Sequence, residues 1–347
     1  MNCSKFCFRL AAILSLGLPL GGSAQAPSLV FEVPADARTA GLGGRLTADF
    51  TGDLHAAAFN PAFLDCEDLG RLALDYVNYF GTTTIGSATA VIDANGRRTT
   101  AVGTRFSTFG QLDEYDASGQ ATGGRFSAGD VIVQLSSAWS FEAGKGHWVT
   151  AGVAGWAGTR TLDRDVAALL GLDIAGRGVL SDQLFSWGVA ITGLGQAWAL
   201  GGSQPTGRMP LNLQLGLAKS FANAPFALHL EASQLQQWDL APEGTYDDIV
   251  DPLTGALSPP MAFPFGDALM RHITMGTALR LGESLEVLVG YDYRRRQELR
   301  AGDRPGTNGL ALGVNFNVKQ FQVRLARNTY HFAGASTHLS VSLDLAS

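Results

Sequence analysis

The sequence is poor in cysteine and in charge, and it has no long apolar run outside its first residues. It holds three Cys in 347 residues, and Cys3 and Cys7 lie in the first ten. Cys66 alone can form neither an internal disulfide nor a thiolate zinc site. Charged residues make up 16% of the chain, against about 25% in soluble domains. Beyond residue 26 no run of about 18 apolar residues is free of charge, which excludes a helical membrane protein.

The first 26 residues have the order of a secretory signal peptide. Lys5 and Arg9 precede an apolar run over 10–20, and the A-x-A cleavage pattern follows at 24–26. The alternative is a short buried N-terminal helix. Removal of this leader would leave 23 basic and 31 acidic residues, a net charge of −8. We therefore expect an exported protein that does not bind nucleic acid, because such binding needs a basic face.

From about Arg71 onward, apolar residues alternate with small or polar ones. Leu312, Val314 and Phe316, for example, lie opposite Gly313 and Asn315. A period of two predicts strands with one apolar face. Many segments run 10–14 residues, which exceeds the usual strand and suits a tilted membrane crossing of about 9–11 residues. Fourteen strands are expected, over 71–80, 83–92, 97–109, 126–141, 147–160, 165–176, 183–193, 209–221, 226–239, 268–281, 285–298, 307–318, 320–332 and 335–345.

The connections between these segments also follow a pattern. Tight turns such as 93–96 and 143–146 alternate with long loops over 110–125, 194–208 and 240–267. Short periplasmic turns and longer outer loops are typical of bacterial barrels. A soluble sandwich shows the same strand alternation, but in lipid only a closed barrel satisfies the backbone of strands. The predicted fold is all-β: an antiparallel transmembrane β-barrel of about fourteen strands in the outer membrane, over residues 71–347.

Residues 27–70 lack this alternation. Short helices are expected here, broken at Gly43-Gly44 and at Asn60-Pro61. With both termini on the periplasmic side, this segment would form a small helical plug beneath or inside the barrel. Small residues on the inward strand faces would leave room for it or permit strand bending; they include Gly152, Gly216, Gly290 and Gly313.

Three charged groups lie in or beside the predicted outer loops. Asp247, Asp248 and Asp251 fit either a Ca²⁺ site or a solvated loop, and their irregular spacing favours the solvated loop. The run Asp113-Glu114-Tyr115-Asp116 suits contact with a basic partner or a wet loop. Residues 294–296, all Arg, fit a phosphate or lipopolysaccharide contact of the outer-membrane lipid, or pairing with Glu298.

Motifs of catalysis and metal binding are missing. The six His show no metal-ligand spacing, and the chain has no G-x-S-x-G, P-loop or H-E-x-x-H pattern. We therefore expect no enzyme, no cofactor and no metal site. The aromatic residues near predicted strand ends fit membrane-interface girdles or core packing; they are Trp148, Trp156, Trp187, Trp198, Tyr291 and Tyr293.

The segment 34–62 contains the pattern P-x-x-A-R-x-x-x-L-G-G, then Asp, then N-P-A. Its residues are Pro34, Ala37, Arg38, Leu42, Gly43, Gly44, Asp53, Asn60, Pro61 and Ala62. Three later stretches follow in order, over 109–126, 224–240 and 271–334. In order and spacing these motifs resemble the PorQ/PorV branch of the FadL-like outer-membrane barrels, over about residues 28–345.

This resemblance implies a role in the type IX secretion system. There the barrel would hold a PorZ-like surface protein beside PorU-like sortase and PorV-like barrel proteins, for export and surface attachment of cargo. The acidic loops, at Asp113, Glu114 and Tyr115 and at 247–251, would be the contacts. The alternative is a FadL-type transporter of a hydrophobic ligand, which needs an apolar pocket that the predicted inward faces do not offer. A soluble secreted β-protein is the third possibility.

Overall fold

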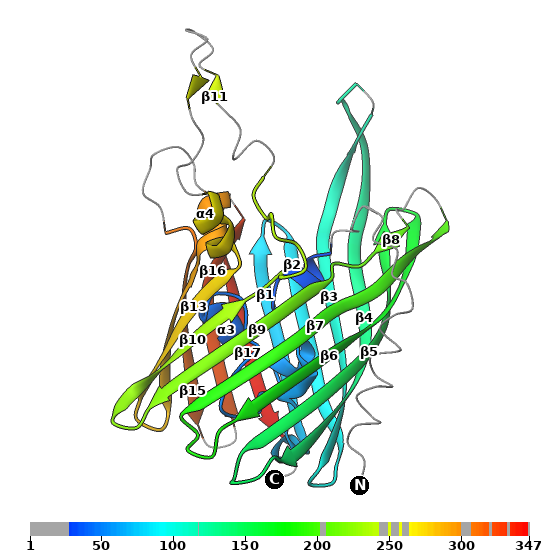
Figure 1. The fold of residues 1–347 in the computed structure, drawn as a ribbon. Helices are drawn as coiled ribbons and strands as arrows, with labels where there is room; N and C mark the ends of the chain where they lie inside the picture. Colours follow the sequence, from blue (N-terminus) through cyan, green and yellow to red (C-terminus); the bar gives the residue numbers. More distant parts are fainter. Residues whose placement is uncertain are drawn as a thin grey trace, which may run out of the picture.

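The computed structural model describes residues 28–116, 118–201, 206–242, 249–250, 257–258, 264–299, 307–318, 321–331 and 334–345. The predicted signal peptide therefore lies outside the described residues. Within them, fourteen long strands form a single closed antiparallel barrel, as the alternation predicted. Each strand pairs with the next along the chain, and β17 pairs with β1 to close the ring (Figure 1).

The barrel strands are β1 (Arg71–Phe80), β2 (Thr83–Ala94), β3 (Arg98–Tyr115), β4 (Ala121–Glu142), β5 (Trp148–Leu162), β6 (Asp165–Val179), β7 (Phe185–Gly201), β9 (Asn212–Phe221), β10 (Ala224–Ala232), β13 (Ile273–Leu281), β14 (Leu285–Asp292), β15 (Leu310–Val318), β16 (Phe321–His331) and β17 (Gly334–Asp344). The short strands are β8 (Gly207–Arg208), β11 (Ile249–Val250) and β12 (Leu257–Ser258). The helices are α2 (Leu29–Glu32), α3 (Ala37–Gly41), α4 (Pro264–Arg271) and α5 (Tyr293–Glu298), with 3-10 turns η1 (Ala56–Ala58), η2 (Pro61–Phe63) and η3 (Cys66–Asp68).

The outer wall of the barrel is apolar and its lumen is largely polar. On β4, Val131, Val133 and Leu135 are 52%, 56% and 57% exposed, whereas the neighbouring Gln134 and Ser136 are buried inside. A soluble sandwich would turn its apolar face inward, so this arrangement is that of a barrel surrounded by lipid. Among the described residues, no helix is long and apolar enough to cross a membrane.

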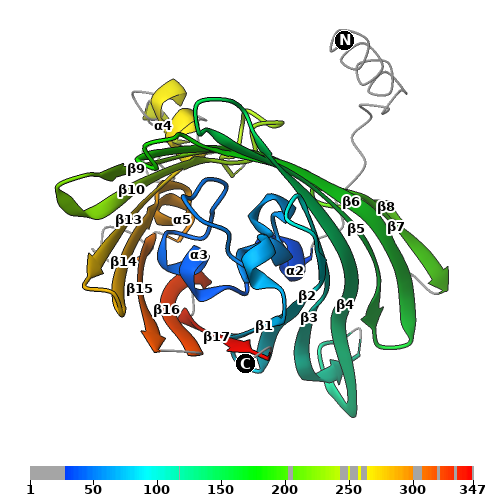
Figure 2. The ribbon, with the colours of Figure 1, turned by 90° about the horizontal axis from the view of Figure 1, so that it is seen from below.

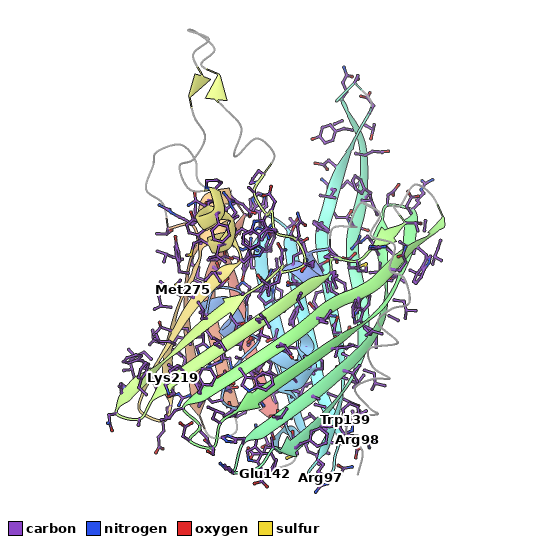
Figure 3. All side chains as sticks on the ribbon, in the orientation of Figure 1. Arg97, Arg98, Trp139, Glu142, Lys219 and Met275 are labelled. Atoms are coloured by element: carbon purple, nitrogen blue, oxygen red, sulfur yellow. The ribbon has the colours of Figure 1, made fainter. Side chains whose placement is uncertain are left out.

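Charged and aromatic side chains gather at the end of the barrel that carries the tight turns. Arg97, Arg98 and Glu142 lie there beside Trp139, whereas Met275 lies higher on the wall (Figure 3). Such a mixed rim suits a membrane–water interface. Trp156, however, is buried in the lumen. Of the two alternatives considered for this residue, the membrane-interface girdle is therefore wrong and core packing is confirmed.

Two predicted strand boundaries are wrong because short helices replace strand ends. The strand predicted over 285–298 stops at Asp292, whose side chain accepts a hydrogen bond from Arg295 N (3.1 Å) and begins α5. The strand predicted from residue 268 starts at Ile273 instead, after α4. The strand predicted over 226–239 is also too long, because β10 ends at Ala232 and irregular structure follows it.

The predicted loop 110–125 is mostly a two-stranded ribbon. β3 continues to Tyr115 and β4 begins at Ala121, and Leu112 pairs with Phe126. Gly110, with φ of 74°, lies at the irregularity where the ribbon leaves the barrel. The ribbon then stands clear of the neighbouring strands (Figure 1).

Residues 28–70 lie inside the ring of strands (Figure 2). α3 packs against β14, β15 and β16, and η2 packs against β4, β5 and β6. Wall glycines make room for this plug. A Cβ on Gly152 would lie 2.5 Å from the carbonyl carbon of Pro61, and one on Gly290 would lie 2.2 Å from Gly43 N. The inward glycines are therefore required for close contact between plug and wall.

Candidate functional site

Arg38 joins the plug to the barrel wall through two carboxylates. It pairs with Asp49 of the plug, and its Nε lies 3.4 Å from Oε2 of Glu286 on β14. Burial alone would lower the pKa of Arg38, but Asp49 and Glu286 raise it well above its usual range. Burial also opposes ionisation of Asp49, yet Arg38 outweighs burial and lowers the pKa of that carboxyl. Both groups of the pair therefore stay charged.

A second ion pair connects the plug to β16. Nη1 of Arg324 donates to Oδ2 of Asp53 at 2.7 Å and lies 3.4 Å from Oδ1 of Asp36. Burial alone would raise the pKa of Asp53, but Arg324 outweighs it and lowers the value to about 2. Burial and the neighbouring Asp53 raise the pKa of Asp36. Asp36 also caps α3 by accepting from the amides of Arg38 (3.0 Å) and Thr39 (2.8 Å).

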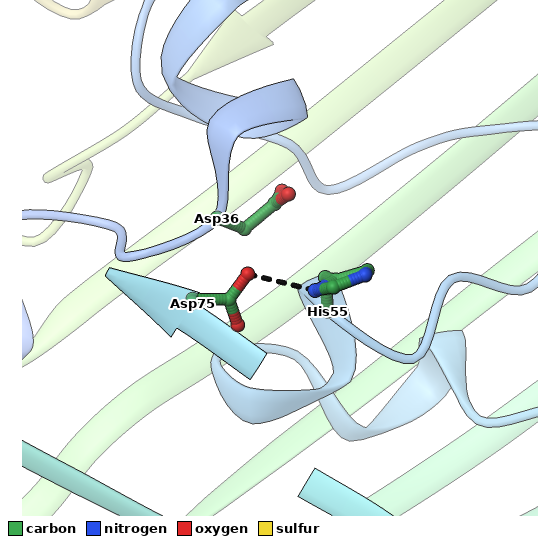
Figure 4. A group of neighbouring side chains, drawn as sticks. All are labelled: Asp36, His55 and Asp75. Carbon is green, nitrogen blue, oxygen red and sulfur yellow. Dashed lines mark hydrogen bonds and ion pairs between the residues drawn. The ribbon is translucent and has the colours of Figure 1, made fainter. Parts of the chain in front are cut away.

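His55 connects the plug to the two strands at the barrel seam. Its Nδ1 lies 2.7 Å from Oδ1 of Asp75 on β1 (Figure 4). Its Nε2 lies 2.7 Å from Oγ of Ser342 on β17. Ser87 donates to the other Asp75 oxygen at 2.6 Å. Burial alone would lower the pKa of His55, but the Asp75 carboxylate outweighs burial and raises it.

Asp36, His55 and Asp75 form a cluster whose potential ligand atoms lie within 4.8 Å of one another. A metal fits this cluster poorly. Both ring nitrogens of His55 and both oxygens of Asp75 already make hydrogen bonds. The oxygens of Asp36 are taken by α3 amides, with the Arg324 cation beside them. The hydrogen bonds of this cluster therefore connect the plug to the barrel wall.

The remaining motif residues shape the plug backbone. Gly43 and Gly44 have φ of 108° and 97°, which other residues rarely adopt. Asn60 accepts from Ala62 N at 3.0 Å and caps η2, while Pro61 at its first position packs on Gly152. The motif residues Gly43, Gly44, Asn60 and Pro61 thus fix the backbone of the plug and its contact with the wall.

In the upper part of the lumen, between α2 and the wall, apolar side chains pack together. We call the space that the Phe31 ring fills among them the apolar chamber. The Phe31 ring of α2 lies 4.8 Å from the ring of Trp156. Gly171 and Gly195 leave space for Trp156, since a Cβ on either would lie under 2.5 Å from its ring. The other members of this buried cluster are Val30, Ile132, Leu169, Ala197 and Met209. Phe31 fills the space among these side chains, so the expectation of inward faces without an open apolar pocket stays a prediction.

A polar cavity of about 630 Å³ lies at the opposite end of the plug. It reaches the β13–β14 turn at Gly282 and Glu283 and the end of β17 at Asp344. Charged side chains of both signs line it, among them Arg38, Asp53, Arg280 and Arg324. This cavity offers water and ions a space below the plug.

Three of the predicted partner-facing residues, Asp113, Glu114 and Tyr115, lie on β3 in the β3–β4 ribbon. Asp113 pairs with Arg125 (3.2 Å) on the ribbon, Glu114 accepts from Thr122, and Tyr115 is 61% exposed. Asp247, Asp248 and Asp251 lie outside the described residues. Nε of Arg294 lies 2.5 Å from Oε1 of Glu298, which is the pairing considered from the sequence.

Comparisons with known proteins identify a fold. No family model matches the chain, and no curated protein matches it. The toluene transporter TodX of Pseudomonas putida has 14% identity over 92% of this chain and 98% of its own, with a TM-score of 0.50. A FadL homologue of Pseudomonas aeruginosa has 12% identity over 91% and 99%, with a TM-score of 0.46. The toluene transporter TbuX of Ralstonia pickettii has 13% identity over 90% and 97%, with a TM-score of 0.45.

The likeness to TodX shows that the two chains share a barrel fold. At this identity it shows the fold alone. The narrower resemblance to the PorQ/PorV branch rests on the sequence motifs.

Proposed function

We propose that this protein is an outer-membrane channel for a small hydrophobic ligand, closed by its own N-terminal segment. The apolar outer wall supports a place in lipid. The observation that carries the proposal is the chamber around Trp156, which is apolar, built into the wall and filled by Phe31 of the plug. Displacement of α2 would present this chamber to a ligand.

The chemistry of the chamber suits a single aromatic or alkyl group. Phe31 and Trp156 lie in a tilted arrangement with an interplanar angle of 56°, a favourable geometry for ring pairs. TodX, which shares the fold, is described as a toluene transporter. A ring of that size would replace the Phe31 side chain without further change in the wall.

The test is Phe31→Ala in the purified barrel, with toluene as probe and tryptophan fluorescence as readout. Removing the ring opens an apolar cavity of the kind that binds benzene. We expect saturable quenching, with affinity at least tenfold above that of the intact chain. Phe50→Ala is the matched control, because Phe50 lies in the plug against His229 instead. Equal toluene binding by both variants and the intact chain would contradict the proposal.

A second candidate function is a surface anchor in type IX secretion. The observation that favours it is the β3–β4 ribbon, which stands clear of the rim with Tyr115 and acidic residues exposed. Its partners would be a PorZ-like surface protein, with PorU- and PorV-like proteins nearby. A pull-down from the native outer membrane in mild detergent tests it. Recovery of these proteins by the intact chain, and their loss when residues 111–127 are shortened to a tight turn, would support anchoring.

The two candidates differ in what purifies with the barrel. A barrel recovered alone with an apolar ligand supports transport and contradicts anchoring. A barrel recovered with the surface proteins, and without response to toluene, supports the reverse.

A further inference from the structure

A small cavity of about 40 Å³ lies between the plug and the wall, next to the chamber of Phe31. Its surroundings are electropositive. Arg45 and Arg105 both line it, and among the described residues that line it none is acidic. Asn60 and the aromatic residues Phe31 and Phe59 also contribute to its walls.

Arg105 on β3 is a buried cation without a hydrogen-bonded counterion. Its side chain is 3% exposed, and its Nε and Nη2 have no hydrogen-bond partner among the described residues. The rings of Phe31 and Phe59 lie 4.8 Å and 5.2 Å from its guanidinium carbon. These faces attract the cation but offer its N–H groups no acceptor in the ring plane.

Asp173 forms a long ion pair with Arg105 through its Oδ2, while its Oδ1 accepts other hydrogen bonds. Asp173 lies 4.0 Å from Nη2 of Arg105, which is too far for a hydrogen bond. Its Oδ1 accepts from Trp156 Nε1 at 3.2 Å and from Gly193 N at 2.7 Å. The charge of Arg105 is therefore only partly compensated.

A second donor on the same cavity is also unused. Asn60 is 4% exposed, and its Nδ2 has no hydrogen-bond partner among the described residues. Its Oδ1 is fixed by the cap on η2, so the amide cannot be flipped without losing that bond. Arg45 directs Nη1 to the carbonyls of Glu32 and Gly44. The cavity is thus lined by two guanidinium groups and by an amide donor without a hydrogen-bond partner among the described residues.

Buried donors and charges require partners, and their absence is costly. Water would satisfy the donors, but only an anion also compensates the guanidinium charge. The volume leaves room for one small ion, since about 10–15 Å³ of such space is enough for a single water molecule. We propose that this cavity binds a single halide ion such as chloride, held by Arg105 and Asn60. This site does not depend on the proposed channel function.

Bromide is the probe for the test, because its anomalous scattering locates it directly. Crystals of the full barrel grown in bromide should show an anomalous peak in contact with the Arg105 guanidinium. In solution, the thermal midpoint of the detergent-solubilised barrel should rise saturably with bromide, relative to gluconate at equal ionic strength.

Asn60→Asp is the decisive variant. It keeps the oxygen that caps η2 and replaces the unused donor with a negative oxygen. We expect it to abolish both the bromide peak and the bromide-dependent rise. Asn317→Asp adds the same charge at the lower cavity, where Asn317 accepts from Gln322, and should leave both unchanged. Absence of the peak in the intact chain, or its persistence in Asn60→Asp, would overturn the proposal and leave water as the occupant.

Discussion

His55 in the plug lies 2.7 Å from Asp75 on β1, the strand that directly follows the plug in the chain. The same imidazole reaches Ser342 on β17, so one side chain bridges the seam at which the barrel closes. The seating of the plug is thereby linked to the closed state of the wall.

We expect the hold of the plug to weaken as pH rises. The pKa of His55 is raised in the folded chain, because Asp75 outweighs burial. Its contribution to stability is therefore complete below about pH 6.5 and is lost as pH rises through the raised value. Limited proteolysis of residues 28–70 in the detergent-solubilised barrel should accelerate with pH. His55→Gln should remove this dependence, and an unchanged profile would refute the role of the imidazole.

Asp68 should act in the same direction at lower pH. Burial raises its pKa from 3.8 to about 6, because Arg71 offsets burial only in part. Such a group destabilises the folded state as pH rises from about 4 to 6. Asp68→Asn should gain about 1–3 kcal/mol relative to the intact chain at pH 8, and nothing at pH 3.5. Unfolding midpoints at the two pH values measure the difference; a loss of stability at pH 8 would show that the Arg71 contact dominates.

The pair Asp53–Arg324 should show strong coupling. Asp53→Asn alone leaves the buried Arg324 without its 2.7 Å partner and should cost about 3–5 kcal/mol. Arg324→Gln alone should cost a similar amount, and the double variant clearly less than the sum. Denaturant unfolding of the four proteins gives the coupling energy. Additive costs would mean that the two side chains stabilise the plug independently.

Two glycines on opposite faces of β5, three residues or about 10 Å apart, provide a matched test of plug fit. A Cβ on Gly152 would meet the plug backbone at Pro61, whereas one on Gly155 would meet nothing within 4 Å. Gly152→Ala should cost about 1–3 kcal/mol and loosen the plug. Gly155→Ala should be neutral. Conductance in planar bilayers should increase only for Gly152→Ala; equal conductance would show that the wall yields instead.

The strands were predictable because the two faces of each strand differ in chemistry. The same alternation could have located Trp156, which shares its inward face with Gly152 on β5. A charged residue inside an apolar alternating strand also has to face the lumen, and Arg105, Asp75 and Arg324 obey this rule. Their partners could not be predicted, because closure of the ring brings together residues as distant in sequence as Asp53 and Arg324. The helix α5 was missed because the period of two continues to Arg294, and the cap at Asp292 overrides it.

α3 lies near the beginning of the chain yet packs against β14, β15 and β16, which are among the last strands to be synthesised. The early part of the polypeptide thus forms a surface on which the late part has to assemble. An error in the seating of α3 would leave these strands without their inner support at the stage when β17 has to find β1. Mutations of the plug would then reduce the yield of closed barrels before they alter any property of the finished protein.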